Sequence, residues 1–134
     1  MGFKQQTKNQ LYANGFIVFD GFSDKEIAVA KKQLFAFVYS GEGEGEITLN
    51  DLSGERYRLR KHSLVIDAYS DSCSVLSLDE AINRFLRELS YTGELFITKV
   101  KLSSPDEDKV HSRYRRKLCI TANELICEGK VEAQ

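Results

Sequence analysis

The side chains that most often carry catalysis or hold metal ions are few in this sequence, and their spacing suits neither task. The two histidines, His62 and His111, stand close to arginines, and the sequence contains no HxH, HxxxH, CxxC or GxSxG motif. Neighbouring positive charge disfavours the protonated imidazole, so both histidines suit surface positions better than the role of a general base. Zinc sites usually need closely spaced His or Cys ligands, and a serine nucleophile commonly lies in a GxSxG turn. The sequence has neither pattern. We therefore expect no catalytic residue, no metal site and no cofactor.

Glycine alternates with glutamate from Gly41 to Glu46, and this glycine content invites comparison with a phosphate-binding loop. Such a loop needs backbone donors without competing carboxylates, and it leads into the N-terminus of a helix. The three acids of this stretch would repel a phosphate, and a strand pattern follows them. We interpret the stretch as a place where glycines let a strand bend or bulge.

Arginine and tyrosine occur together in two short segments, around Tyr57 and around Tyr114. Guanidinium groups pair with phosphates and tyrosines stack on bases, so the combination fits binding of single-stranded RNA or DNA. Arginine in alternation with apolar residues is equally typical of the solvated face of a strand, and acids lie one hairpin strand away. The residues that would contact a nucleic acid or another partner are Arg56, Arg58, Arg60, Arg113, Tyr114, Arg115 and Arg116.

The elements that would position these side chains centre on residues 38–69, whose pattern predicts a β-meander. Ile47 and Leu49 fall on one face of a first strand. In the next strand Tyr57 and Leu59 alternate with the arginines, so that one face is apolar and the other polar. We expect the apolar face to be buried and the arginine face to be solvated.

Turn chemistry and changes of phase predict where these strands end. Ser53-Gly54 has the composition of a hairpin turn between the first two strands. The alternation changes phase at 61–63, which predicts a corner before a more buried strand. Near the C-terminus, a hairpin turned at 122–123 is predicted.

Signals outside the meander predict an α+β fold that is mainly β with helices. An apolar stripe that includes Ala81, Ile82 and Phe85 predicts an amphipathic helix near 79–90. The other predictions are a flexible segment at 1–10, strands at 16–19, 33–40 and 94–102, and a helix cap at 23–24.

Length and composition fit one globular domain. The chain has 134 residues, of which 42% are hydrophobic and 29% charged, with a formal net charge of −1. Domains cluster at about 100–150 residues, so we expect residues 1–134 to form a single domain. No apolar run reaches the roughly 18 residues of a membrane helix, and the N-terminus is too polar for a secretory signal. We expect a cytoplasmic protein without membrane contact.

The order of strands and helix resembles a known family over residues 38–90. A Gly-Glu step runs into a short hairpin at Gly43–Leu49, a Tyr-x-Leu strand follows at Tyr57–Leu59, and a corner leads to an apolar strand at His62–Ile66. With the helical segment that follows, this resembles the cupin-like N-terminal sensory domain of AraC-type transcriptional regulators. The paired histidines of metal-dependent cupins are absent, and residues 105–134 do not resemble the DNA-binding units of that family. The resemblance therefore fits a sensory domain of a longer regulator or a stand-alone module.

The resemblance implies a cupin-like β-barrel or sandwich that acts as a non-enzymatic ligand-sensing and dimerisation domain. It implies a homodimer and a small-molecule effector, with nucleic acid contacted only through a separate DNA-binding domain. We expect the interior to be filled by side chains rather than hollow, as in other small barrels. The residues implied to face the interior, and so a ligand, are Phe35, Phe37, Tyr57, Leu59 and Tyr69. The alternative is a small α+β interaction protein, of phage or mobile-element type, that binds RNA, DNA or a host protein through the arginine-rich segments.

Overall fold

The computed structural model describes residues 2–20, 34–50, 54–70, 75–108 and 113–130. Within these ranges the chain forms mostly strands, with helices at two places, which confirms the predicted α+β class. The predicted helix cap at 23–24 lies outside the described residues. In chain order the elements are α1 (Phe3–Ala13), β1 (Ile17–Asp20), β2 (Phe35–Ser40), β3 (Gly45–Asn50), β4 (Glu55–Tyr69), α3 (Val75–Glu88), β5 (Leu95–Leu102), β6 (Asp106–Asp108) and β7 (Arg113–Lys130).

The strands form one sheet in the order β1-β2-β4-β7-β5, with β3 added to β4 and β6 added to β7. β1 and β2 are parallel, and the other pairs are antiparallel. The two long strands, β4 and β7, pair from Glu55 opposite Lys130 to Tyr69 opposite Arg115. No pairing joins β1 to β5 among the described strands, so closure of this sheet into a barrel stays a prediction.

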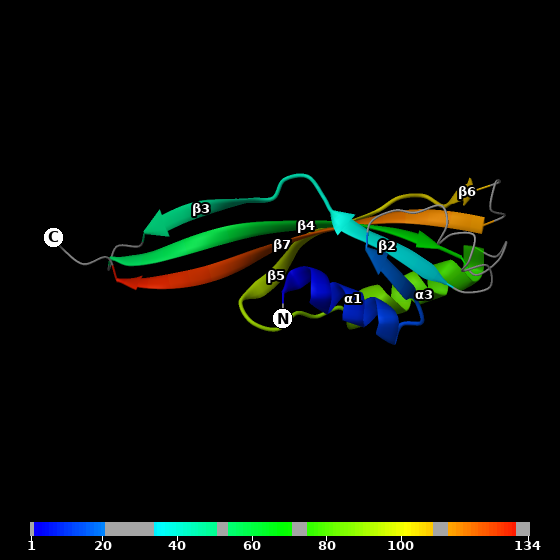
Figure 1. Cartoon of the computed structure of the whole chain (residues 1–134), viewed down its shortest axis with the longest axis horizontal. Helices are drawn as coiled ribbons and strands as arrows, with labels where there is room; N and C mark the ends of the chain where they lie inside the picture. The colour runs from blue at the N-terminus through cyan, green and yellow to red at the C-terminus, as the bar shows by residue number, and fades with distance from the viewer. Residues whose placement is uncertain (1, 21–33, 51–53, 71–74, 109–112, 131–134) are drawn as a thin grey trace.

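β4 changes its neighbour halfway along its length. Residues 64–69 pair with β2, whereas residues 56–61 pair with β3. We call the three-stranded part made by residues 45–50, 55–61 and 123–130 the arm. Figure 1 shows that the arm extends away from both helices, which lie together on one side of the other half of the sheet.

The two faces of the sheet differ in what covers them. Leu64, Ile66 and Ala68 of β4 belong to the main core, which they share with residues of α1 and α3. We therefore call the face of the even-numbered β4 residues the helix face and the opposite, odd-numbered one the far face. The register places Ile47 and Leu49 of β3 on the far face, because they lie opposite Leu59 and Tyr57.

The predicted amphipathic helix is confirmed as α3, which begins at Val75 rather than near 79. Its stripe of Leu78, Ala81, Ile82 and Phe85 is buried in the main core. Side chains at these spacings share one face of a helix, so a sheet can cover them together.

Residues 3–13 form helix α1, in the segment for which the sequence predicts flexibility at 1–10. Phe3, Thr7 and Leu11 are buried at a spacing of four residues, which is one turn of helix. The rest of the segment is polar, and part of it bonds to the chain after α3: the Gln6 side-chain oxygen accepts from the Thr92 amide at 2.8 Å. Because only Phe3 and Leu11 are apolar among these buried residues and the rest of the segment is polar, the sequence pattern did not predict an amphipathic helix here.

Two predicted breaks are absent from the sheet. β4 runs through 61–63 without a corner, and β7 runs through 122–123 without a turn. The two places face each other, with Lys61 opposite Asn123 and His62 opposite Ala122. Each strand supplies backbone hydrogen bonds to the other there, so polar residues at this point do not interrupt either one.

Tyr91 joins α1 to the segment after α3 through a hydrogen bond of 2.7 Å between its hydroxyl and that of Thr7. Burial raises the pKa of Tyr91 from 10.0 to about 12. Above pH 10.0 the unfolded chain releases this proton while the folded chain retains it, so the folded state loses stability as the pH rises to about 12. Urea unfolding at increasing pH is expected to show this loss, and Tyr91→Phe is expected to reduce its slope. An unchanged slope in the variant would contradict this assignment.

Gly41 lies where the chain passes from β2 towards the arm, and its amide donates to the Ser63 carbonyl at 2.9 Å. A Cβ at this position would collide with Ser63 Oγ and lie 3.3 Å from Val65 Cγ2. Gly41→Ala is therefore expected to lower the free energy of unfolding by about 1–3 kcal/mol. Gly45→Ala is the matched control, since nothing lies within 4 Å of a Cβ there. Equal urea midpoints for the two variants would contradict the clash.

Candidate functional site

Three of the five residues predicted to face a ligand form a packed aromatic cluster. Phe35, Phe37 and Tyr69 are at most 1% exposed. The rings of Phe35 and Tyr69 are stacked at 4.7 Å, and the Phe37 ring meets Tyr69 edge-on at 5.9 Å. The guanidinium of Arg113 lies 4.7 Å from the centre of the Phe35 ring. The contacts fill this part of the far face with side chains.

The other two residues, Tyr57 and Leu59, lie in the arm. Tyr57 is twelve residues from Tyr69 on the same strand, a separation of about 40 Å at the rise of a β-strand. Both residues share the far face with the aromatic cluster. The structure therefore places the five residues on one face but does not gather them around a single site.

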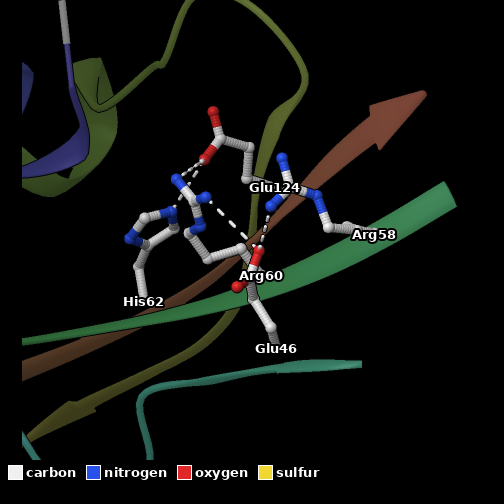
Figure 2. Close-up of polar contacts among 5 residues, drawn as sticks. All are labelled: Glu46, Arg58, Arg60, His62 and Glu124. Atoms are coloured by element: carbon white, nitrogen blue, oxygen red, sulfur yellow. Dashed lines mark hydrogen bonds and ion pairs between the residues drawn. The ribbon is translucent and has the colours of Figure 1, made fainter. Parts of the chain in front are cut away.

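The first arginine segment lies on the helix face of the arm, where its charges meet carboxylates. Figure 2 shows Arg58 and Arg60 converging on Glu46 of β3, at 3.2 and 3.3 Å. His62 contacts Glu124 of β7 at 3.0 Å, and Arg60 lies 3.7 Å from the same carboxylate. Arg56 is exposed near the start of β4. Cross-strand pairing thus offsets much of the positive charge on this face.

The side chains of the second arginine segment lie on both faces of the sheet and contact other elements of the fold. Arg113 is 2% exposed and donates to the Ser70 carbonyl at 2.6 Å. Arg115 pairs with Asp106 at 2.8 Å, and Arg116 pairs with Asp79 of α3 at the same distance. Tyr114 packs against the main core. These side chains link elements of the fold and do not form one basic surface.

A partly buried tyrosine–aspartate pair, which the sequence did not reveal, lies near the aromatic cluster. The Tyr39 hydroxyl donates to Asp67 Oδ2 at 2.8 Å, and Asp67 is 6% exposed. Burial and then this hydrogen bond raise the pKa of Tyr39. The pair joins β2 to β4, and neither residue belongs to a motif that would have singled it out.

On the far face of the arm, large apolar side chains gather without a covering helix. Among the described residues, β5 also exposes Phe96, Ile97 and Val100. Ile47 and Leu49 are 47% and 44% exposed. Tyr57 and Leu59 lie opposite them on β4, and Leu125 of β7 lies opposite Leu59. Sequence alternation predicted correctly that the first four share a face. The expectation that this face is buried is wrong for Ile47 and Leu49.

Neither a metal centre nor a membrane span is found in the described ranges. No group of three or more His, Cys, Asp or Glu side chains could hold a metal ion there. None of the helices in those ranges has the length and apolar character needed to cross a membrane.

Comparisons with known proteins leave the family of this chain unassigned. No protein-family model matches the sequence, and no curated protein matches it. One solved chain, from a structure described as the virion of a native gene transfer agent particle, is 16% identical with a TM-score of 0.47. The match covers 91% of this chain and 90% of that one. At this TM-score the similarity carries no argument about fold or function.

Proposed function

We propose that this chain is a non-enzymatic protein-binding module and that its binding surface is the far face of the arm. Ile47 and Leu49 carry the proposal, because both are nearly half exposed side by side on a strand that is itself exposed at every residue. Contiguous apolar surface that water reaches is characteristic of protein interaction sites. A three-stranded arm extending from the folded body can place such a surface against a partner.

The charges of the arm favour a protein partner over a nucleic acid. Binding to a phosphate backbone relies on cations that are available to replace counterions. Arg58 and Arg60 instead contact Glu46, which lies on the neighbouring strand of the same face. The opposite face offers apolar side chains, which suit the core of a protein interface.

Of the two roles that the family resemblance implies, the arm fits dimerisation better than the packed aromatic cluster fits ligand sensing. A dimerisation role fits an arm with an open apolar face. Sensing of a small effector would need space beside Phe35, Phe37 and Tyr69, and these rings are packed against one another. An AraC-type regulator therefore stays a prediction, and the proposed function concerns protein contact alone.

A pair of adjacent substitutions tests the proposed function in cells of the source organism. Leu49→Lys places a charge on the far face, whereas Thr48→Lys places the same charge on the helix face. Tagged chains are cross-linked in the cells and the attached proteins, including untagged copies of this chain, are identified by mass spectrometry. We expect a partner that Thr48→Lys retains and Leu49→Lys loses. Equal recovery with both variants would contradict the proposal.

A further inference from the structure

We infer that the far face of the sheet, where β5 and β7 lie beside the root of the arm, binds single-stranded nucleic acid. The site goes beyond the proposed function, because it does not use the apolar side chains of the arm. Four exposed lysines lie on this face, and we call them the lysine band. They are Lys61 of β4, Lys99 and Lys101 of β5, and Lys117 of β7.

The strand register places the lysine band on one face and close together. Lys99 and Lys101 lie opposite Thr121 and Cys119 of β7, and the pairing of β7 with β4 puts both of these residues on the far face. Lys117 lies on the same face, two residues before Cys119. Diagonal neighbours on adjacent strands are about 7–8 Å apart, so Lys101 and Lys117 are neighbours.

A bulge in β5 brings an aromatic ring onto the same face. Side chains alternate along a regular strand, so Phe96 and Lys99 would ordinarily point to opposite faces. The register shifts between Ile97 and Lys99, and as a result Phe96 lies opposite Asn123 while Lys99 lies opposite Thr121. An extra residue of this kind re-aims the side chains that follow it. Phe96 is 47% exposed, so its ring is open to a ligand beside the lysines.

The charge of the lysine band is available to a ligand. None of its four lysines forms an ion pair within the part of the chain that the structure describes. Asp67, which lies opposite Lys117, is buried, and Asp106 of the same face is held in an ion pair of 2.8 Å. The lysines differ in this respect from Arg58 and Arg60, which contact Glu46. Cations without such partners can replace the counterions of a phosphate backbone.

The exposed ring favours a single strand over a duplex or an acidic protein. Proteins that bind single strands combine cations for the phosphates with aromatic rings on which unpaired bases stack. The bases of a duplex already stack on one another, and an acidic protein surface would need the lysines alone. The Glu94 carbonyl accepts from the Leu125 amide, which places this acid on the arm side of Phe96. We therefore expect phosphates on the lysine side of the ring.

Fluorescence anisotropy of the purified full-length chain with labelled oligothymidine and oligouridine tests the site. We expect a dissociation constant of roughly 1–100 µM and, for four phosphate contacts, a slope of log affinity against log salt of about −3. Replacing Lys99 and Lys101 together by Gln is expected to halve this slope and to weaken binding at low salt about tenfold or more. Phe96→Ala is expected to weaken binding about fivefold or more and to leave the slope unchanged.

Two other exposed cations provide the matched control. Arg56→Gln combined with Arg87→Gln removes the same charge from the helix face of the arm and from α3. We expect this double variant to stay within about twofold of the parent affinity, because solvent-exposed charges that are far apart are screened by salt. Thermal unfolding of each variant shows whether it is folded.

Several results would overturn the inference. They are a parent chain that binds neither oligonucleotide at low salt, equal losses in the lysine and arginine double variants, and binding of a duplex or a poly-glutamate peptide as tight as that of the single strands. Binding of oligothymidine or oligouridine alone supports the site and identifies the strand as DNA or RNA. Leu49→Lys is expected to leave this binding unchanged. A chain that binds no oligonucleotide but still loses a cellular partner through Leu49→Lys overturns the site and leaves the proposed function standing.

Discussion

Phe85→Ala is expected to lower the free energy of unfolding by about 3–5 kcal/mol. Phe85 is 1% exposed and packs in the main core, in which α3 meets the helix face of the sheet. Truncation removes most of the buried ring and leaves a cavity that the long strands β4 and β7 cannot close without losing their pairing. Urea denaturation of both proteins measures the difference.

Leu76→Ala is the control for this substitution, since Leu76 lies on the same helix and is 65% exposed. Its expected effect is within about 0.5 kcal/mol. A loss below about 1 kcal/mol in Phe85→Ala would contradict the position of α3 on the sheet.

Arg113→Ala is expected to destabilise the fold by about 2–4 kcal/mol, although its charge would ordinarily suggest a surface residue. The guanidinium donates to the Ser70 carbonyl and covers the Phe35 ring, and the side chain is 2% exposed. The truncation removes a charge-assisted hydrogen bond and leaves a void beside the aromatic cluster.

Arg115→Ala is the matched control, because Arg115 lies on the same strand and face and its side chain is 41% exposed. Its removal breaks the ion pair with Asp106 and the hydrogen bond to the side chain of buried Tyr69, so we expect a loss of about 1–2 kcal/mol, smaller than that of Arg113→Ala. Equal losses from the two arginine variants in urea unfolding would contradict a structural role specific to Arg113.

The parts of the fold that periodicity specifies could be predicted from the sequence. Helix α3 has a wide apolar stripe, and β3 and β4 alternate cleanly, so the residues that share each face were grouped correctly. The continuity of β4 and β7 could not be predicted, because it depends on long-range pairing. Taken alone, the segments around Lys61 and Asn123 have the composition of a corner and a turn. In the structure the two residues pair with each other in the middle of β4 and β7.

The candidate site could be predicted only in part, for a related reason. Alternation shows that Ile47, Leu49, Tyr57 and Leu59 share a face, but it does not show whether another layer covers that face. The natural expectation was an interior, and the arm instead carries the face beyond the helices (Figure 1). The sequence could not show whether the two arginine segments bind a partner or form ion pairs within the fold. Their carboxylate partners Glu46, Glu124 and Asp79 come from other elements.

We propose that the far face of the arm, and not its helix face, meets another protein. Photo-crosslinking in cells of the source organism tests it most directly, with a benzophenone amino acid placed at position 49 in one variant and at position 48 in another. The two positions are adjacent on β3 and differ only in the face they present. We predict a covalent adduct with a protein at position 49 and little or none at position 48. Adducts of equal yield at both positions, or at position 48 alone, would contradict the account.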